Sequence, residues 1–162
     1  MRKYFIFLTV VLFTIFLRAQ EKIVTHEQIA LDFFAHEVIN KEYKNIKHVL
    51  FDGNLEEESP IAYSYCMHFL SENNVFKNPD IRSINIPHNT SISKDISLFR
   101  KIFTSKNKIA KIYVFKHYLM DENVVVVIWL STKSFSDYYS ILIDKDDKRV
   151  LDYCKKTYYE QG

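Results

Sequence analysis

Glycine, cysteine and proline are all scarce in this chain of 162 residues, which contains two glycines, two cysteines and three prolines. Two glycines, Gly53 and Gly162, are too few for a glycine-rich phosphate loop or a dinucleotide-binding fingerprint. Two cysteines exclude an all-cysteine zinc ribbon and a disulfide-dense miniprotein. The sequence therefore predicts no cofactor of these kinds, and we assign none.

An excess of charge of one sign is also lacking. The chain carries 22 Lys and Arg against 20 Asp and Glu. Three of the basic residues and none of the acidic ones lie within residues 1–19, which leaves 19 basic and 20 acidic groups in residues 20–162. This balance disfavours a strongly basic nucleic-acid binder, so we expect no nucleic-acid partner.

The N-terminal segment has the pattern of a secretory signal. Two basic residues precede residues 4–17, which carry no charge. As a helix these fourteen residues extend about 21 Å, less than the roughly 30 Å hydrocarbon core of a bilayer. A signal peptide over 1–19, cleaved after Ala19, therefore fits better than an uncleaved anchor, the one route by which we expect membrane contact. We expect 20–162 to form a single exported domain, periplasmic or extracellular.

Export places Cys66 and Cys154 in an oxidising compartment. Their one intramolecular pairing would close a loop of 88 residues and would stabilise the fold by about 4–5 kcal/mol if it is unstrained. Two buried free thiols and a reactive thiol are the alternatives. Each cysteine has an aromatic neighbour in the sequence, and an apolar setting makes a thiol inert, so we expect neither to be catalytic.

A long helix is predicted over residues 26–43. Thr25 can cap it, with Gln28 three residues later, and apolar residues recur at helical spacing. A strand is predicted over 47–52, followed by an Asp-Gly turn.

The middle of the chain is less regular. Residues 61–70 fit a helix, which the preceding Ser-Pro favours, or a strand. Residues 71–92 read as a loop with a short strand at 81–86. Ser93 is then expected to cap a short helix with a stripe of apolar residues: Ile96, Leu98, Phe99, Ile102 and Phe103.

The last third of the chain reads as β-structure. Short polar connections between apolar, β-branched runs predict an antiparallel meander. One run, VVVVIWL at 124–130, is apolar at every position, so we expect an internal strand that is covered on both faces. The four expected strands are 110–119, 124–130, 138–143 and 149–158.

This order of elements predicts an α+β fold with a long N-terminal helix packed on a curved antiparallel meander sheet. It resembles the cystatin-like and nuclear-transport-factor-like α+β families, and small exported bacterial proteins of this size. The resemblance covers most of residues 25–158 and implies a cone in which the sheet wraps the helix. It transfers no functional residue.

Asp32, His36 and Tyr43 are the candidate catalytic set. They recur along one face of the predicted helix, and a carboxylate, an imidazole and a phenol facing a pocket can perform acid–base chemistry. The alternative is a half-exposed Asp–His pair that only stabilises the helix. The six histidines do not show metal-binding spacing, so no metal site is predicted.

The leading functional hypothesis is an exported, non-catalytic binding or interaction domain for a protein or a small apolar ligand. The sheet face or the mouth of the cone would make the contact. One tyrosine of each adjacent pair, 138–139 and 158–159, is expected to be exposed. An acid–base enzyme built on Asp32, His36 and Tyr43 is the alternative. A structural component of an envelope complex is a further one.

Overall fold

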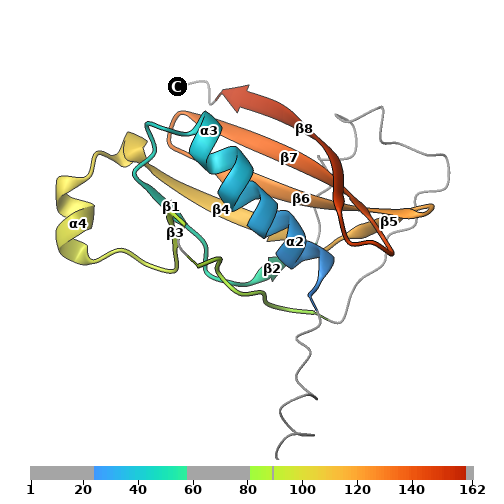
Figure 1. Cartoon of the computed structure of the whole chain (residues 1–162). Helices are drawn as coiled ribbons and strands as arrows, with labels where there is room; N and C mark the ends of the chain where they lie inside the picture. Colours follow the sequence, from blue (N-terminus) through green and yellow to red (C-terminus); the bar gives the residue numbers. More distant parts are fainter. Residues whose placement is uncertain (1–23, 58–80, 89, 160–162) are drawn as a thin grey trace, which may run out of the picture.

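The computed structural model describes residues 24–57, 81–88 and 90–159. Within them, one 17-residue N-terminal helix packs on a mostly antiparallel mixed sheet of eight strands (Figure 1). The predicted α+β class is therefore confirmed. No helix among these residues is long and apolar enough to span a bilayer.

The helix starts at its predicted cap, since Thr25 Oγ1 accepts a hydrogen bond from the backbone N–H of Gln28 at 3.2 Å. It runs through α2 (His26–Phe33), a π-helical stretch η1 (Phe34–Ile39) and α3 (Asn40–Glu42). The predicted helix over 26–43 is confirmed, although its middle is wider than an α-helix. A buried stripe faces the sheet, formed by Ala30, Leu31, Phe34, Ala35, Val38 and Ile39.

The main path of the sheet runs in the order β3-β1-β4-β6-β7-β8, with β2 beside β4 and β5 beside β6. The last four strands on this path are antiparallel, which confirms the predicted meander. The strands are β1 (His48–Leu50), β2 (Leu55–Glu56), β3 (Ile92–Ser93), β4 (Ile109–Phe115), β5 (Tyr118–Met120), β6 (Asn123–Ser131), β7 (Phe135–Asp144) and β8 (Val150–Tyr159).

Two features of the sheet differ from the prediction. The early strands β1 and β2 pair with β4 in parallel, so the sheet is mixed. The strand expected over 110–119 is divided into β4 and β5, and at the break one backbone N–H bonds to β2 and the next bonds to the helix. Lys116 N–H donates to the carbonyl of Glu56, and His117 N–H donates to the carboxylate of Glu27.

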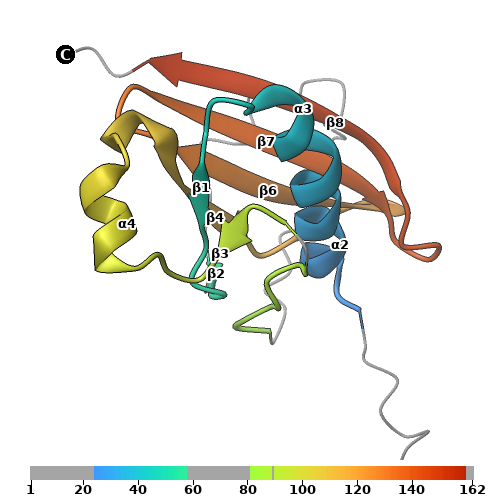
Figure 2. The same cartoon turned by 60° about the vertical axis from the view of Figure 1, so that its left-hand side comes forward.

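Both faces of the central strand β6 are covered, as predicted. The helix lies against one face of the sheet (Figure 2). Val126 has no exposed surface and belongs to the main core on this face. Val127 is 1% exposed and belongs to a second apolar cluster on the opposite face. The main core is filled by side chains from the helix and from strands β1, β4, β6 and β7.

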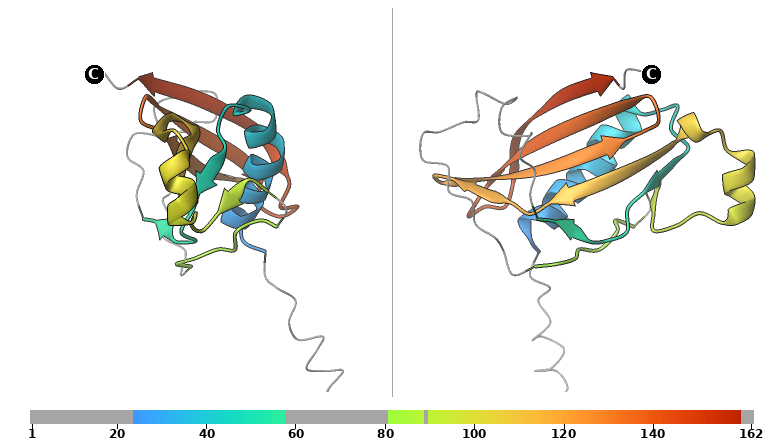
Figure 3. Two further views of the ribbon diagram at one scale, coloured as in Figure 1. Left: turned by 90° about the vertical axis from the view of Figure 1, so that its left-hand side faces the viewer. Right: turned by 180° about the vertical axis from the view of Figure 1, so that it is seen from behind.

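The predicted start of the short helix at Ser93 is wrong. Ser93 lies in β3, and the helix cap is Ser97, whose Oγ accepts from Arg100 N–H at 3.3 Å. The helix α4 is therefore only Leu98–Phe103, and it projects from one end of the sheet (Figure 3). Ile96 is buried but precedes the helix, whereas Phe99 is exposed.

The strand expected at 81–86 is reduced to one antiparallel bridge between Ser83 and Asn54. The segment 61–70 and Cys66 lie outside the described residues, so the choice of helix or strand and the disulfide stay predictions.

Candidate functional site

The structure separates the three predicted acid–base residues. Asp32 and His36 line a cavity of about 580 Å³ between the helix and residues 83–88. Tyr43 is buried at the other end of the helix, against β7. The carboxylate, the imidazole and the phenol therefore do not face a common space.

The cavity wall is tied together by Gln28. Its side-chain amide donates to Asp32 Oδ1 and to the carbonyl of Asn85, both at 2.9 Å, and its oxygen accepts from Asn85 N–H at 2.8 Å. No hydrogen bond or ion pair joins Asp32 to His36, although both are described. His88 also lines the cavity. The arrangement offers polar groups to a ligand but no assembled acid–base pair.

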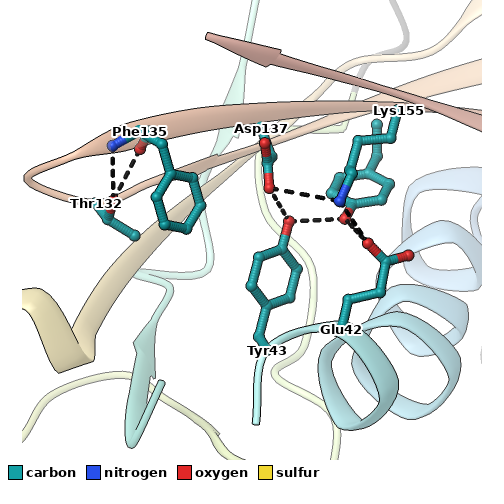
Figure 4. Close-up of polar contacts among 7 residues, drawn as sticks. Glu42, Tyr43, Thr132, Phe135, Asp137 and Lys155 are labelled. Carbon is teal, nitrogen blue, oxygen red and sulfur yellow. Dashed lines mark hydrogen bonds and ion pairs between the residues drawn. The ribbon is translucent and has the colours of Figure 1, made fainter. Parts of the chain in front are cut away.

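A partly buried polar cluster surrounds Tyr43 (Figure 4). Its hydroxyl donates to Asp137 Oδ2 and lies 2.7 Å from the hydroxyl of Tyr139. Tyr139 donates in turn to Glu42 Oε2 at 2.8 Å, and Lys155 Nζ donates to the same oxygen at 2.6 Å. Lys155 also lies 3.9 Å from Asp137. The cluster joins the C-terminal end of the helix to β7 and β8.

The electrostatics of this cluster suit anchoring. Burial, and then the hydrogen bond to Asp137, raises the pKa of Tyr43 well above its ordinary value. Burial, and then the contact with Tyr43, does the same for the pKa of Tyr139, so both phenols remain donors. Burial alone would lower the pKa of Lys155, but its bond to Glu42 and the charge of Asp137 raise it, so the ammonium is retained. None of these residues lines the cavity that holds Asp32 and His36.

A second buried carboxylate fixes the start of the helix. Glu27 has no exposed surface, and its Oε1 accepts hydrogen bonds from His117 backbone N–H at 3.0 Å and from His117 Nδ1 at 2.7 Å. The ring of His26 meets that of His117 edge-on at 5.2 Å. Burial lowers the pKa of His26, which keeps its imidazole neutral more readily. This pairing holds the helix against the break between β4 and β5.

The face of the sheet opposite the helix carries a row of aromatic rings. Trp129 on β6 stacks between Tyr113 on β4, at 4.7 Å, and Tyr138 on β7, at 5.4 Å. Tyr138 meets Tyr158 of β8 edge-on at 5.5 Å. All four rings are half-buried. The expectation of one exposed tyrosine per pair is wrong for 138–139, because Tyr138 is half-buried and Tyr139 is buried. It is confirmed for 158–159, where Tyr159 is 78% exposed.

Among the residues that the structure describes, the most exposed large apolar side chains outside β8 gather on α4. Phe99, Ile102 and Phe103 are 71%, 69% and 74% exposed, and we call these three residues the α4 patch. The two rings lie 4.8 Å apart, one helical turn from each other. Isolated exposed apolar residues are ordinary, but a cluster on one short helix marks a contact surface.

Basic residues flank the α4 patch in the sequence. Residues 94–108 contain five basic residues and one acidic residue, in a domain whose total charge is close to zero. The acidic residue, Asp95, pairs with Lys101 at 3.0 Å. All five basic side chains belong to exposed residues: Lys94, Arg100, Lys101, Lys106 and Lys108.

The basic residues beside the apolar stripe, rather than the helical spacing of the stripe, are the sequence signal for this surface. An apolar stripe on a helix is buried only if another element covers it. Basic residues on both sides of the short stripe are the feature that indicates a solvent-facing helix end.

A smaller cavity of about 280 Å³ lies between the end of the sheet and the α4 segment, and its lining includes Lys94 and Lys101. Among residues 24–57, 81–88 and 90–159, no three His, Cys, Asp or Glu side chains form a group that could hold a metal ion. Comparisons with protein-family models, curated proteins and solved structures found no match to this chain.

Proposed function

We propose that this chain is an exported, non-catalytic interaction domain that binds its partner through the α4 patch. One observation carries the proposal: three large apolar side chains, each at least 69% exposed, lie together on a helix of six residues. Full burial of such a side chain stabilises by roughly 1.5–3 kcal/mol relative to exposure, and a bound partner would bring part of this stabilisation.

The other classes have weaker support. An acid–base enzyme needs its groups around one reacting atom, and Tyr43 lies apart from the Asp32 and His36 cavity. A small apolar ligand inside the cone needs space between helix and sheet, where buried side chains pack. The cystatin-like resemblance remains a proposal about architecture. A structural role in an envelope complex would use the same α4 surface.

Photo-crosslinking in the producing cell tests the proposal. A p-benzoylphenylalanine replaces Phe103 in one variant and Asp146 in a control variant. Asp146 is exposed in the hairpin between β7 and β8, at the opposite end of the sheet from α4. We expect an adduct, with a protein or with a lipid, from position 103 and none from position 146. Equal yields at the two positions, or no adduct at 103, would refute the proposal.

A further inference from the structure

We infer that the partner of the α4 patch is a lipid surface with anionic headgroups, an inference that rests on the function proposed above. It adds a membrane contact made by the folded domain, separate from the N-terminal apolar segment.

The α4 patch has the geometry of an interfacial helix face. At about 100° per residue, Ile102, Phe99 and Phe103 fall within an arc of about 100°. Arg100 lies about 60° beyond one edge of this arc, and Lys101 lies nearly opposite its centre. Such a segment can place its apolar side chains at the headgroup–acyl boundary while its cations stay in water.

The charge around the α4 patch suits anionic lipid. Residues 94–108 carry a formal net charge of +4, since five basic residues accompany one acidic residue. At the opposite end of the sheet, the turns at 121–122 and 144–149 carry five acidic and three basic residues, a net charge of −2. Asp52, Glu56 and Lys111 share the small cavity with Lys94 and Lys101, and counting them with residues 94–108 still leaves a net charge of +3. The α4 segment and its cavity are therefore more basic than the turns at the opposite end, and a negative surface attracts them first.

A lipid surface fits the contact better than a protein does. Stable protein interfaces bury about 800 Å² on each side and use roughly 20–30 residues, and lysine is depleted in them. The α4 patch has three apolar residues on a projecting helix (Figure 3), and four of its five basic neighbours are lysines. A bilayer requires only that a projecting element reach the headgroups.

Vesicle co-sedimentation of the exported protein, purified from its producing cell, tests the inference. We compare phosphatidylcholine vesicles with vesicles of phosphatidylcholine and phosphatidylglycerol. We expect preferential binding to the anionic vesicles, and weaker binding when salt rises from about 0.1 M to 0.5 M, because the Debye length shortens.

Two double variants separate the apolar from the charged contribution. F99S/F103S should weaken binding to anionic vesicles about tenfold or more, since each buried aromatic side chain contributes the equivalent of about that factor. K106Q/K108Q should reduce the preference for anionic over neutral vesicles and its salt dependence. The control L151S/Y153S alters exposed apolar residues of β8, at 42% and 40%, and should bind as wild type does.

The outcomes distinguish the two proposals. Vesicle binding that is equal for wild type, F99S/F103S and the control overturns the lipid inference. Wild type that fails to bind either vesicle, with a protein adduct from position 103 in the cell, overturns it while the interaction function stands. Absence of both vesicle binding and any adduct overturns both proposals.

Discussion

Replacing Glu27 by Gln should destabilise the fold by about 2–4 kcal/mol. The Gln side chain keeps the shape but loses the charge that accepts two hydrogen bonds from His117. A hydrogen bond to a charged group contributes about 1.5–3 kcal/mol, and a carboxylate in the first helical turn gains a further ~0.3–1 kcal/mol from the helix dipole. Glu27 Oε2 is buried with no hydrogen-bond partner among the described residues, so the new amide would bury unsatisfied donors there.

The pH dependence of this effect follows from the pKa of Glu27. Burial by itself raises that pKa, but the hydrogen bonds from His117 outweigh burial and lower it below its ordinary value of 4.5. A lowered folded pKa gives stability that is fully present above the unfolded pKa and is lost as pH falls through the folded pKa. The difference between wild type and E27Q should therefore be constant at neutral pH and shrink below about pH 4.5.

Urea unfolding followed by the fluorescence of Trp129, the only tryptophan, measures both effects. The matched control is E37Q, because Glu37 pairs with Lys41 on the exposed side of the same helix. We expect E37Q to stay within about 0.5 kcal/mol of wild type. If E27Q behaves like E37Q, or if its destabilisation does not change with pH, the structural role assigned to Glu27 is wrong.

Four further predictions concern the core, the polar cluster, the cysteines and export. Val127→Asp should cost more than about 3 kcal/mol in urea unfolding, because it buries an unpaired charge, and a wild-type midpoint would contradict the sheet packing. Tyr43→Phe should cost about 1–3 kcal/mol by the same assay, since it removes a buried donor, whereas an unchanged midpoint would contradict the anchoring role. Thiol titration should detect no fast-reacting native thiol, and a disulfide between Cys66 and Cys154 would leave none after denaturation either. Mass spectrometry of the exported protein should find an N-terminus at or near Gln20, and intact Met1 in a soluble cytosolic pool would refute export.

Local signals were sufficient for the helix and the meander. Thr25 and Gln28 placed the start of the helix, and the uninterrupted apolar run at 124–130 placed an internal strand, because capping and two-sided burial each leave a pattern in adjacent residues. The parallel pairing of β1 with β4 leaves no such pattern in adjacent residues. It joins His48 to Ile109 across 61 positions, through a strand of three residues.

The candidate site was harder to predict for a related reason. Tyr43 and Asp137 meet across 94 positions, so helical spacing grouped Tyr43 with Asp32 and His36, while the fold turned it toward β7. The apolar spacing of α4 was visible in the sequence. Whether another element covers that stripe depends on the end of the sheet from which α4 projects, which spacing alone does not encode.

Hydroxyl-radical footprinting of Phe99 and Phe103 tests the central claim most directly. Oxidation of both rings is measured by mass spectrometry in the purified protein and in the intact producing cell. Tyr153, an exposed ring on β8, is the internal reference. The α4 patch predicts rapid oxidation of both phenylalanines in the purified protein and several-fold protection in the cell, with Tyr153 unchanged. Equal oxidation of Phe99 and Phe103 in the two settings would contradict the claim that this surface is where the domain binds.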